Sequence, residues 1–570
     1  MKNKLVEILN KNIPSLDKQT IDDLIEVPLN SSMGDYAFPC FKLAKELKKS
    51  PVVIAKEIAE KIGTVDFIEK TECVNAYINF FVNKEQFVKQ TIVPMIQQGE
   101  KYGIDKSKSK GNIIIDFSSP NIAKPFHIGH LRSTVIGNSL YRIFEALGYN
   151  CISINHLGDW GTQFGKLIVA YKNYSSKEAV EQKGIQELLR IYVMFHEEAE
   201  KDSTLEQQAR DYFTKMEQGD EEALELWKWF KQISLKEFEY VYNLLDVEFD
   251  SFNGEAFYND KMAPVIKELE DKNLIKVSDG AKIVELENMP PCLITKRDGS
   301  TLYATRDITA AKYRKQTYDF KKCIYVTALQ QNLHFKQWFE VIKKMGYEWY
   351  KDLVHVPFGM VSIEAEDKSK PAQAIATRKG NVILLQDLLN QAIQKTKEII
   401  EEKNPNLEDK DTVAMQVGIG AIIFDDMYNT IIKDIEFSWS KALNFDGETG
   451  PYVQYTHARA CSVLRKSNIE EYDISLIDFD LITDEASITL VKQIGNFKSA
   501  INDAANKYEP SIIARYAVNV AQAFNKFYHD NAILVDDQKL KYARLSLVYC
   551  TTNILKNTLY LLGIGAPIKM

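Results

Sequence analysis

The 570-residue chain has no apolar run that approaches the roughly 20 residues of a membrane span, and its start (MKNK) leads into mixed polar sequence without a signal-peptide core. We therefore expect a cytoplasmic protein with no membrane attachment. Its seven cysteines lie dozens of residues apart and form no C-x-x-C pair, which disfavours a disulfide framework and a structural zinc site. Since 45% of the residues are hydrophobic, the chain is too apolar to be disordered, and its length predicts roughly three to four domains.

The sequence also lacks an excess of positive charge. With 71 Lys+Arg against 79 Asp+Glu, its formal net charge is -8, which by itself disfavours a polyanionic partner. The acidic residues are concentrated in one segment, however. Residues 171–290 hold 27 Asp+Glu and 15 Lys+Arg, so the other 450 residues carry a net charge of +4. Residues 1–110 have a net charge of +2, and residues 446–570 have a net charge of -1. An RNA partner would therefore be met by local basic and aromatic patches, with a modest dependence of binding on salt.

The first domain is predicted to be residues 1–110, because the segment that ends it (KSKSKG, 106–111) has the composition of an exposed linker. A short β-branched apolar run follows at 112–117, then loop residues at 118–121. A helix pattern covers about 129–147, and a second strand is expected at 151–154. Strand, loop, helix and strand in this order predict the start of a parallel α/β sheet.

The acidic stretch 171–290 has the pattern of helices with solvated faces, and sheet signals resume only at 322–328. We interpret 171–290 as an insertion between two halves of one sheet, within a nucleotide-binding domain of residues 111–445. From 446 to 570 the spacing of apolar residues is helical throughout. The predicted fold class is α/β, with an α+β N-terminal domain and an all-α C-terminal domain.

The sharpest motif is His127-Ile128-Gly129-His130, between a buried strand and the start of a helix. Two imidazoles at a helix N-terminus add donors to the unsatisfied backbone N–H groups, and together these favour a phosphate chain. Gly129 has no side chain, so a flat base can approach the backbone closely. The alternative is a chance tetrapeptide with histidines in the core or on the surface.

A second basic loop is needed to hold a leaving pyrophosphate, because phosphoryl-type transfer depends mostly on positioning and charge stabilisation. Residues 377–381 (TRKGN) fit, with two adjacent cations, Arg378 and Lys379, before a Gly-Asn turn. The alternative is a solvated basic turn. The histidine motif ahead of it in the same sheet favours the phosphate-binding role.

Residues 116–134 (DFSSPNIAKPFHIGHLRST) closely resemble the signature of arginyl-tRNA synthetases, class I enzymes with HIGH and KMSKS motifs. The resemblance continues through 155–165 (NHLGDWGTQFG), 303–307 (YATRD), 330–331 (QQ), 450–459 (GPYVQYTHAR) and 562–567 (LGIGAP), and so extends over essentially the whole chain. HIGH alone indicates only the class, whereas the longer strings indicate arginine.

The resemblance implies that the carboxylate of arginine attacks the α-phosphorus of Mg-ATP, and that the arginyl group then passes to the terminal adenosine of tRNA-Arg. It implies ATP contacts from His127, Gly129, His130, Arg378 and Lys379, and arginine contacts from Asp116, Ser119, Asn121, His130, Tyr303, Asp307 and Gln331. The residue types agree with binding of arginine, because a guanidinium needs a carboxylate with supporting acceptors. Asp307 and Tyr303, four residues apart, supply them. The alternative for these two is a surface helix pair.

The chain departs from the class pattern at the KMSKS equivalent, which reads AIATRK at 374–379 and lacks both lysines in register. In the family, a lysine just upstream of the histidine motif compensates for a missing second lysine, and Lys124 has that place here. Our hypothesis is that Lys124 and Lys379 share phosphate stabilisation, so that both are catalytic together with His127 and His130.

The resemblance also implies tRNA contacts. Tyr77 and Asn79 match family positions that hold a splayed base, by stacking and an edge hydrogen bond; the alternative is a plain buried strand. Tyr452, Tyr455 and Arg459 match the anticodon side, with helix packing as the alternative.

Two rival functions remain. One is a class I synthetase for another amino acid, and the other is a non-catalytic RNA-binding relative, which the intact pair His127 and His130 disfavours. Other histidines are scattered without metal-ligand spacing, so we expect no resident metal, no zinc and no organic cofactor. A monomer is the family expectation.

Overall fold

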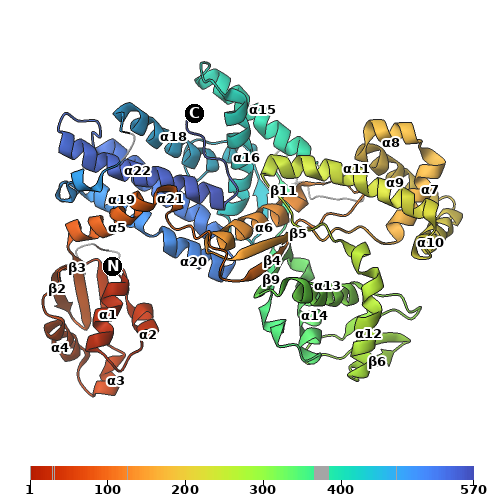
Figure 1. Cartoon of the computed structure of the whole chain (residues 1–570), viewed down its shortest axis with the longest axis horizontal. Coiled ribbons are helices and arrows are strands. Elements are labelled where there is room, and N and C mark those ends of the chain that lie inside the picture. The colour runs from red at the N-terminus through yellow and green to blue at the C-terminus, as the bar shows by residue number, and fades with distance from the viewer. Residues whose placement is uncertain (1, 29, 31–32, 125, 365–383, 470–471) are drawn as a thin grey trace. The chain divides into compact units, whose positions relative to one another are not determined.

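The computed structural model describes the chain except residues 1, 29, 31–32, 125, 365–383 and 470–471. The chain divides into two units (Figure 1). The first unit contains residues 1–102, 463–496 and 522–553, and the second contains residues 103–462, 497–521 and 554–570. The domain boundaries that the sequence suggests near residues 110 and 445 stay predictions.

The N-terminal part of the first unit is an antiparallel sheet with helices. Its strands are β1 (Tyr36–Pro39), β2 (Ile68–Val74) and β3 (Tyr77–Val82), in the order β1-β3-β2. The helices are α1 (Lys2–Asn12), α2 (Lys18–Leu24), α3 (Leu43–Leu47), α4 (Pro51–Ile62) and α5 (Lys84–Gln98), followed by the 3-10 turn η2 (Gly99–Lys101). Leu9 of α1, Ile54 of α4 and Phe80 of β3 meet in a common buried core. The α+β character predicted for this region is confirmed.

The second unit is built on a four-stranded parallel sheet in the order β10-β9-β4-β5. The strands are β4 (Asn112–Asp116), β5 (Asn150–Ile154), β9 (Lys322–Ala328) and β10 (Leu353–Phe358). Ile113, Ile114 and Ile115 are all fully buried, as expected for a parallel strand covered on both faces. The connections after β4 and after β9 leave in opposite directions, which opens a crevice at the carboxyl ends of these neighbouring strands.

Helices cover both faces of this sheet (Figure 1). α6 (Ile128–Ala146) follows β4 and contacts β4, β5 and β9. On the other face, α13 (Tyr303–Tyr318) and α14 (Asn332–Lys344) bury Ile308 and Trp338 against Ile114 and Ile154. The 3-10 turns η4 (Leu329–Gln331) and η5 (Glu348–Asp352) flank α14.

The acidic insertion is largely helical, as predicted. It contains the end of α7 (Thr162–Tyr174), and α8 (Lys177–Lys183), α9 (Ile185–Ala199), α10 (Thr204–Glu217), α11 (Glu221–Leu245), η3 (Glu255–Lys261) and α12 (Met262–Asp271). The expectation that sheet signals resume only at residue 322 was wrong. β6 (Ile275–Ser278), β7 (Ala281–Val284) and β8 (Cys292–Thr295) form a small antiparallel sheet. Asp279-Gly280, a hairpin signal, joins β6 to β7, and both residues have positive φ.

The remaining elements are mostly helices, apart from β11 (Val361–Ile363), which pairs in parallel with β12 (Ile435–Phe437). The helices are α15 (Leu385–Lys403), α16 (Lys410–Tyr428), α17 (Trp439–Ala442), α18 (Gly450–Ser467), α19 (Glu485–Gly495), α20 (Phe497–Lys507), α21 (Ser511–Asp530) and α22 (Gln538–Leu561). Two short 3-10 turns, η6 (Ile474–Leu476) and η7 (Phe479–Leu481), lie between α18 and α19. After β12 the described residues contain no strand, which confirms the helical C-terminal region. Of the helices in the described ranges, none is both long and apolar enough to span a membrane.

Candidate active site

The two histidines of the predicted motif lie at the start of α6. His127 is the N-cap residue, and its Nδ1 accepts a hydrogen bond from Gly129 N at 3.0 Å. His130 Nδ1 accepts in return from His127 N at 3.2 Å, and the two ring centroids are 4.0 Å apart. Because both Nδ1 atoms accept, a neutral ring must carry its proton on Nε2. Each imidazole therefore offers an Nε2–H donor beside the helix N-terminus, where anions bind well.

Burial keeps these imidazoles neutral. It lowers the pKa of His127 to about 4, and it lowers the pKa of His130 to about 3, with a further contribution from the neighbouring His127. At neutral pH the pair therefore offers an anion hydrogen-bond donors and the helix dipole, and not formal charge.

The loop from β4 to α6 has a strained backbone that buried hydrogen bonds hold in place. Ser118, Ser119 and Ala123 have positive φ (70°, 48° and 58°), which is unusual for residues with a side chain. Ser118 N donates to Ser133 Oγ at 2.9 Å, and Ala123 N donates to Ser234 Oγ of the insertion at 3.0 Å. The loop geometry is therefore set before any ligand arrives.

A buried tyrosine of the insertion joins the same network. Tyr242 OH is 2.8 Å from Ser118 Oγ and accepts a hydrogen bond from Asn155 Nδ2 at 2.8 Å. Tyr242 and Asn155 carry no role in the sequence prediction. Asn155 stands at the start of the recognised string 155–165, but nothing in the sequence linked it to Tyr242.

Asn121, predicted to contact arginine, lies against a glycine of the string 155–165. Ile122 N donates to Gly158 O at 3.1 Å, and Gly158 N donates to Pro120 O at 3.1 Å. A Cβ on Gly158 would lie 2.2 Å from Asn121 Oδ1. Glycine is therefore required at 158 for the two loops to approach.

Asp116, also predicted to contact arginine, is 6% exposed and already engaged. Its Oδ2 is 2.7 Å from Nη1 of the buried Arg314, and its Oδ1 accepts from Ser119 Oγ at 3.0 Å. Burial disfavours the charged guanidinium of Arg314, but Asp116 outweighs this effect and the Arg314 pKa is raised. Arg314 was missed from the sequence, because it lies outside the recognised strings.

Tyr303 and Asp307 lie on the first two turns of α13, and Gln331 ends η4 directly after β9. Tyr303 is 66% exposed and Gln331 is exposed, so both side chains are accessible to a ligand. Asp307 Oδ2 is 2.5 Å from Nε2 of His334, on the first turn of α14. His334 was passed over in the sequence as one of the scattered histidines.

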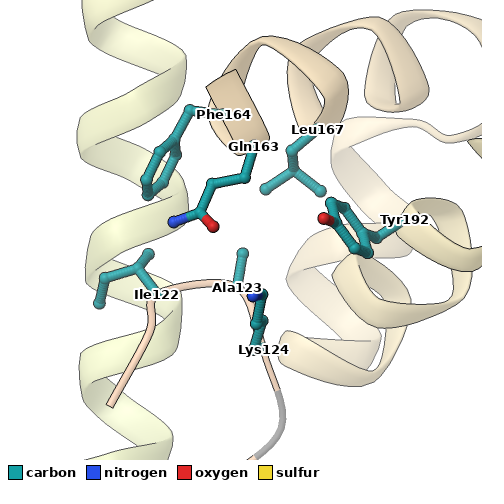
Figure 2. Close-up of a pocket in the computed structure, with 7 residues that line it drawn as sticks. All are labelled: Ile122, Ala123, Lys124, Gln163, Phe164, Leu167 and Tyr192. Carbon is teal, nitrogen blue, oxygen red and sulfur yellow. The ribbon is translucent and has the colours of Figure 1, made fainter. Parts of the chain in front are cut away.

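Lys124 borders a small pocket between the strained loop and the insertion (Figure 2). In Figure 2 the side chains of Gln163 and Leu167 from α7 and Tyr192 from α9 face Ala123 and Lys124. Arg378 and Lys379, the other predicted cations, lie outside the described residues. The described chain resumes next to the histidine motif, where Leu385 N donates to Phe126 O at 2.8 Å and Leu384 bridges to His127.

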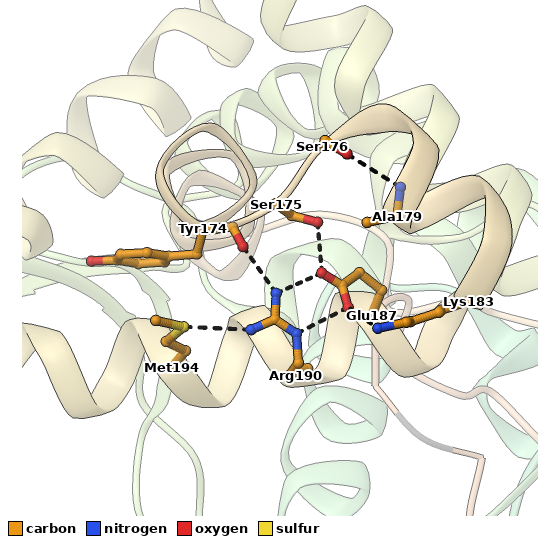
Figure 3. Close-up of polar contacts among 8 residues, drawn as sticks. All are labelled: Tyr174, Ser175, Ser176, Ala179, Lys183, Glu187, Arg190 and Met194. Carbon is orange, nitrogen blue, oxygen red and sulfur yellow. Dashed lines mark hydrogen bonds and ion pairs between the residues drawn. The ribbon is translucent and has the colours of Figure 1, made fainter.

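The helices beside this pocket are held by an ionic cluster around the buried carboxylate of Glu187 (Figure 3). Glu187 of α9 is 2% exposed, and it accepts from Arg190 Nε and Nη2 at 2.9 and 2.6 Å and from Ser175 Oγ at 2.7 Å. The hydrogen bonds from Arg190 lower the pKa of Glu187 to about 2. Arg190 Nη2 also donates to Tyr174 O at 2.9 Å, which ties α9 to the end of α7.

The residues predicted to contact tRNA lie on two elements. Tyr77 and Asn79 are on β3, where Tyr77 makes an edge contact with Phe41 and Asn79 is only 1% exposed. The Asn79 Nδ2 atom is buried and has no hydrogen-bond partner among the residues that the structure describes. Tyr455 on α18 is 41% exposed, and the guanidinium of Arg459 lies 4.9 Å from its ring centroid. Tyr452 is partly exposed on the same helix.

No group of three or more His, Cys, Asp or Glu side chains suited to hold a metal ion is found in the described part of the chain. The seven cysteines are all free thiols, and six of them are buried. The polar side chains that converge on the site are therefore imidazoles, amides, hydroxyls and the carboxylates of Asp116 and Asp307.

Comparison with known proteins matches this arrangement to a class. Residues 91–439 match the model described as "tRNA synthetases class I (R), catalytic domain". Residues 1–82 match the "Arginyl tRNA synthetase N terminal domain", and residues 453–570 match the "DALR anticodon binding domain". The parallel sheet, the histidine motif and the first of these matches define a class I aminoacyl-tRNA synthetase.

Curated relatives indicate the family. The arginine–tRNA ligase of Alkaliphilus metalliredigens is 56% identical over 571 residues, which is 100% of this chain and 99% of that protein. The arginine–tRNA ligase of Clostridioides difficile is 56% identical over 564 residues, 99% of this chain and 98% of that protein. The chain belongs to the arginyl-tRNA synthetase family.

Solved structures share the fold. Arginyl-tRNA synthetase from Plasmodium falciparum has a TM-score of 0.80 at 26% identity, with 100% of this chain and 99% of that chain covered. Arginyl-tRNA synthetase from Thermus thermophilus has a TM-score of 0.83 at 23% identity, with both chains fully covered.

Proposed function

We propose that the protein is an arginine–tRNA ligase. It activates L-arginine with Mg-ATP to arginyl-adenylate, releases pyrophosphate and transfers arginine to the 3′ end of tRNA-Arg. The observations that support this proposal are a neutral imidazole pair suited to phosphate at the start of α6, which follows β4, and a carboxylate suited to a guanidinium, Asp307, in contact with His334 after β9. Mg²⁺ enters as part of the ATP substrate.

The phosphate side is supplied by the start of α6. The Nε2–H groups of His127 and His130 and the N-terminal amides of α6 donate to the phosphates, while Gly129 leaves room for the adenine to approach. Donors that are held in place before the reaction stabilise the charge that develops on the phosphoryl oxygens at little reorganisation cost. Lys124, with Arg378 and Lys379, adds formal positive charge for the departing pyrophosphate.

The arginine side is supplied by α13 and η4. Asp307 accepts the guanidinium, and Tyr303 and Gln331 add acceptors beside it. A guanidinium presents donors in a planar fork, so a carboxylate distinguishes it from lysine by geometry and from neutral citrulline by charge.

Asp116 acts through Ser119. Both of its oxygens are engaged, by Arg314 and by Ser119 Oγ, so we assign it the task of holding Ser119 and Asn121 toward the amino-acid backbone. This differs from direct contact with the guanidinium. Ser119 has left-handed backbone geometry that a free loop would abandon.

The tRNA contacts that we propose are Tyr77 and Asn79 on one element and Tyr452, Tyr455 and Arg459 on another. Tyr455 with Arg459 offers an exposed aromatic ring and a cation, which suit base stacking and a phosphate. Action in the cytoplasm as a monomer is proposed from family membership alone.

The test is aminoacylation of total tRNA with each of the 20 amino acids, alongside ATP–pyrophosphate exchange with and without tRNA. We expect charging with arginine only, and exchange that depends on tRNA. Charging with another amino acid would overturn the proposal, and exchange without tRNA would contradict the tRNA-dependent activation expected for the family.

A further inference from the structure

The carboxylate of Asp307 has a partner that no assigned role explains. Nε2 of His334 lies 2.5 Å from Asp307 Oδ2, and the two side chains are 29% and 27% exposed, respectively. The pair is therefore partly exposed and not sealed in the core. His334 is three residues after Gln331, so η4 and the first turn of α14 bring both residues to the same edge.

We propose that His334 is a positioning residue for arginine binding, which holds the Asp307 carboxylate in the orientation that a guanidinium requires by donating a hydrogen bond to it. The inference deepens the proposed function, because it rests on Asp307 as the residue that binds the guanidinium.

The His334 imidazole assists arginine binding through geometry. A carboxylate only accepts hydrogen bonds, so His334 must donate Nε2–H to Asp307 Oδ2. This bond restricts the rotation of the carboxylate and leaves Oδ1, with the second lone pair of Oδ2, for the two parallel N–H groups of a guanidinium. A bidentate pair of this kind depends strongly on the orientation of the carboxylate.

Asp307 on α13 supplies a charged group in contact with the His334 imidazole. His355 of β10 stacks on Phe335 at 4.3 Å, and burial lowers its pKa to about 4, so it is neutral at physiological pH.

The other elements packed against α14 add little charge at this end. From β8, Cys292 is a neutral thiol, because burial raises its pKa to about 12. η4 contributes only uncharged residues. The charged residues of η5, at 348, 351 and 352, follow the C-terminal end of α14, roughly 15 Å or more along the helix from His334.

The experiment compares wild type, His334→Ala and His334→Gln as full-length enzyme at pH 7.5, by the KM for arginine and the kcat of aminoacylation. We expect His334→Ala to raise the KM about tenfold with kcat within twofold, because the Asp307 carboxylate loses the donor that orients it. His334→Gln keeps an N–H donor, so it should recover most of the affinity.

The matched control is His529→Gln, since His529 also lies beside a carboxylate, with Nδ1 3.0 Å from Asp530 Oδ1, but is 89% exposed on α21. It should leave the KM for arginine unchanged. An unchanged KM in His334→Ala, or equal losses of kcat and stability in both His334 variants, would overturn the inference.

The variant Asp307→Asn distinguishes an error in the proposed arginine pocket from an error in the proposed role of His334. If Asp307→Asn leaves the KM for arginine unchanged, the proposed pocket itself is wrong. If it raises the KM strongly while His334→Ala has no effect, the pocket stands and the role of His334 is refuted.

Discussion

The two sides of the candidate site are built differently. On the phosphate side, the loop from β4 to α6 holds strained residues through buried hydrogen bonds to Ser133, Ser234 and Tyr242, and its imidazoles are neutral. On the arginine side, Tyr303 is 66% exposed and Asp307 has one short contact, to His334. The proposed phosphate site is thus held in place by buried hydrogen bonds, whereas the proposed arginine site depends on an accessible carboxylate.

The largest effect on activity should come from a substitution in the proposed arginine site. Asp307→Asn removes the charge and one acceptor that the guanidinium requires, so we expect the KM for arginine to rise at least 100-fold, or about 2.7 kcal/mol. The KM for ATP should change less than threefold. Steady-state aminoacylation measures both values.

Asp319→Asn is the matched control, because Asp319 ends the same helix, is 90% exposed and has a left-handed backbone that asparagine also adopts. An ATP effect in Asp307→Asn as large as the arginine effect would show that the two sides are not separate.

The phosphate side is tested by two changes at one residue. His127→Ala removes both the Nε2–H donor and the N-cap acceptor, whereas asparagine keeps an acceptor suited to an N-cap. We expect both variants to slow adenylate formation about 100-fold, and only alanine to lower the free energy of unfolding, by about 1 kcal/mol. Full activity in His127→Asn would show that only the cap matters.

The pH profile of the wild type adds to this test. Because burial lowers the pKa of His127 to about 4, this imidazole stays neutral down to about pH 5. Its folded pKa is below the unfolded value of about 6.5, so it makes folding less favourable as the pH falls below 6.5. A single-turnover adenylation rate that titrates near pH 6.5 would contradict a neutral pair.

Lys124 is expected to have an intermediate effect. Lys124→Ala should slow adenylate formation about tenfold, or about 1.4 kcal/mol, if it stabilises the charge of the leaving pyrophosphate. Lys177→Ala, at a 68% exposed lysine of α8, is the control and should have no effect. A rate within twofold of wild type would refute the role of Lys124.

The smallest effect on catalysis should come from the insertion. Glu187→Gln weakens a buried carboxylate's bonds to Arg190 and should lower the free energy of unfolding by about 2 kcal/mol at pH 7, with kcat within twofold. The folded pKa of Glu187, about 2, is below the unfolded value of about 4.3. The stabilisation is therefore present above pH 4.3 and is lost as the pH falls toward 2.

Urea unfolding followed by tryptophan fluorescence at several pH values measures this loss. Glu181→Gln is the control, since its pair with Lys177 is exposed and 3.8 Å long, and it should change stability by less than about 0.5 kcal/mol. Equal effects of the two variants would contradict a special role for the Glu187 cluster.

Local patterns in the sequence determined much of the architecture. β-branched runs predicted β4, β5 and β9, and helical spacing predicted α6 and the C-terminal helices, because burial on one or both faces requires these periods. The histidine motif was likewise readable, since a cap and its helix are adjacent in the chain. The small sheet β6-β7-β8 was missed, although Asp279-Gly280 carried its turn signal.

Only the tertiary structure revealed which charged side chains contact each other. Neither the contact of Asp116 with Arg314 nor that of Asp307 with His334 leaves a spacing signal, because their residues come from different elements and meet where strands and helices pack. The negative charge of the whole chain was also a poor guide to its partners, since the acid lies mainly in one insertion. The sequence by itself determined the fold class and the family, whereas the packing of the sheet decided which carboxylate remains accessible to a substrate and which is already neutralised.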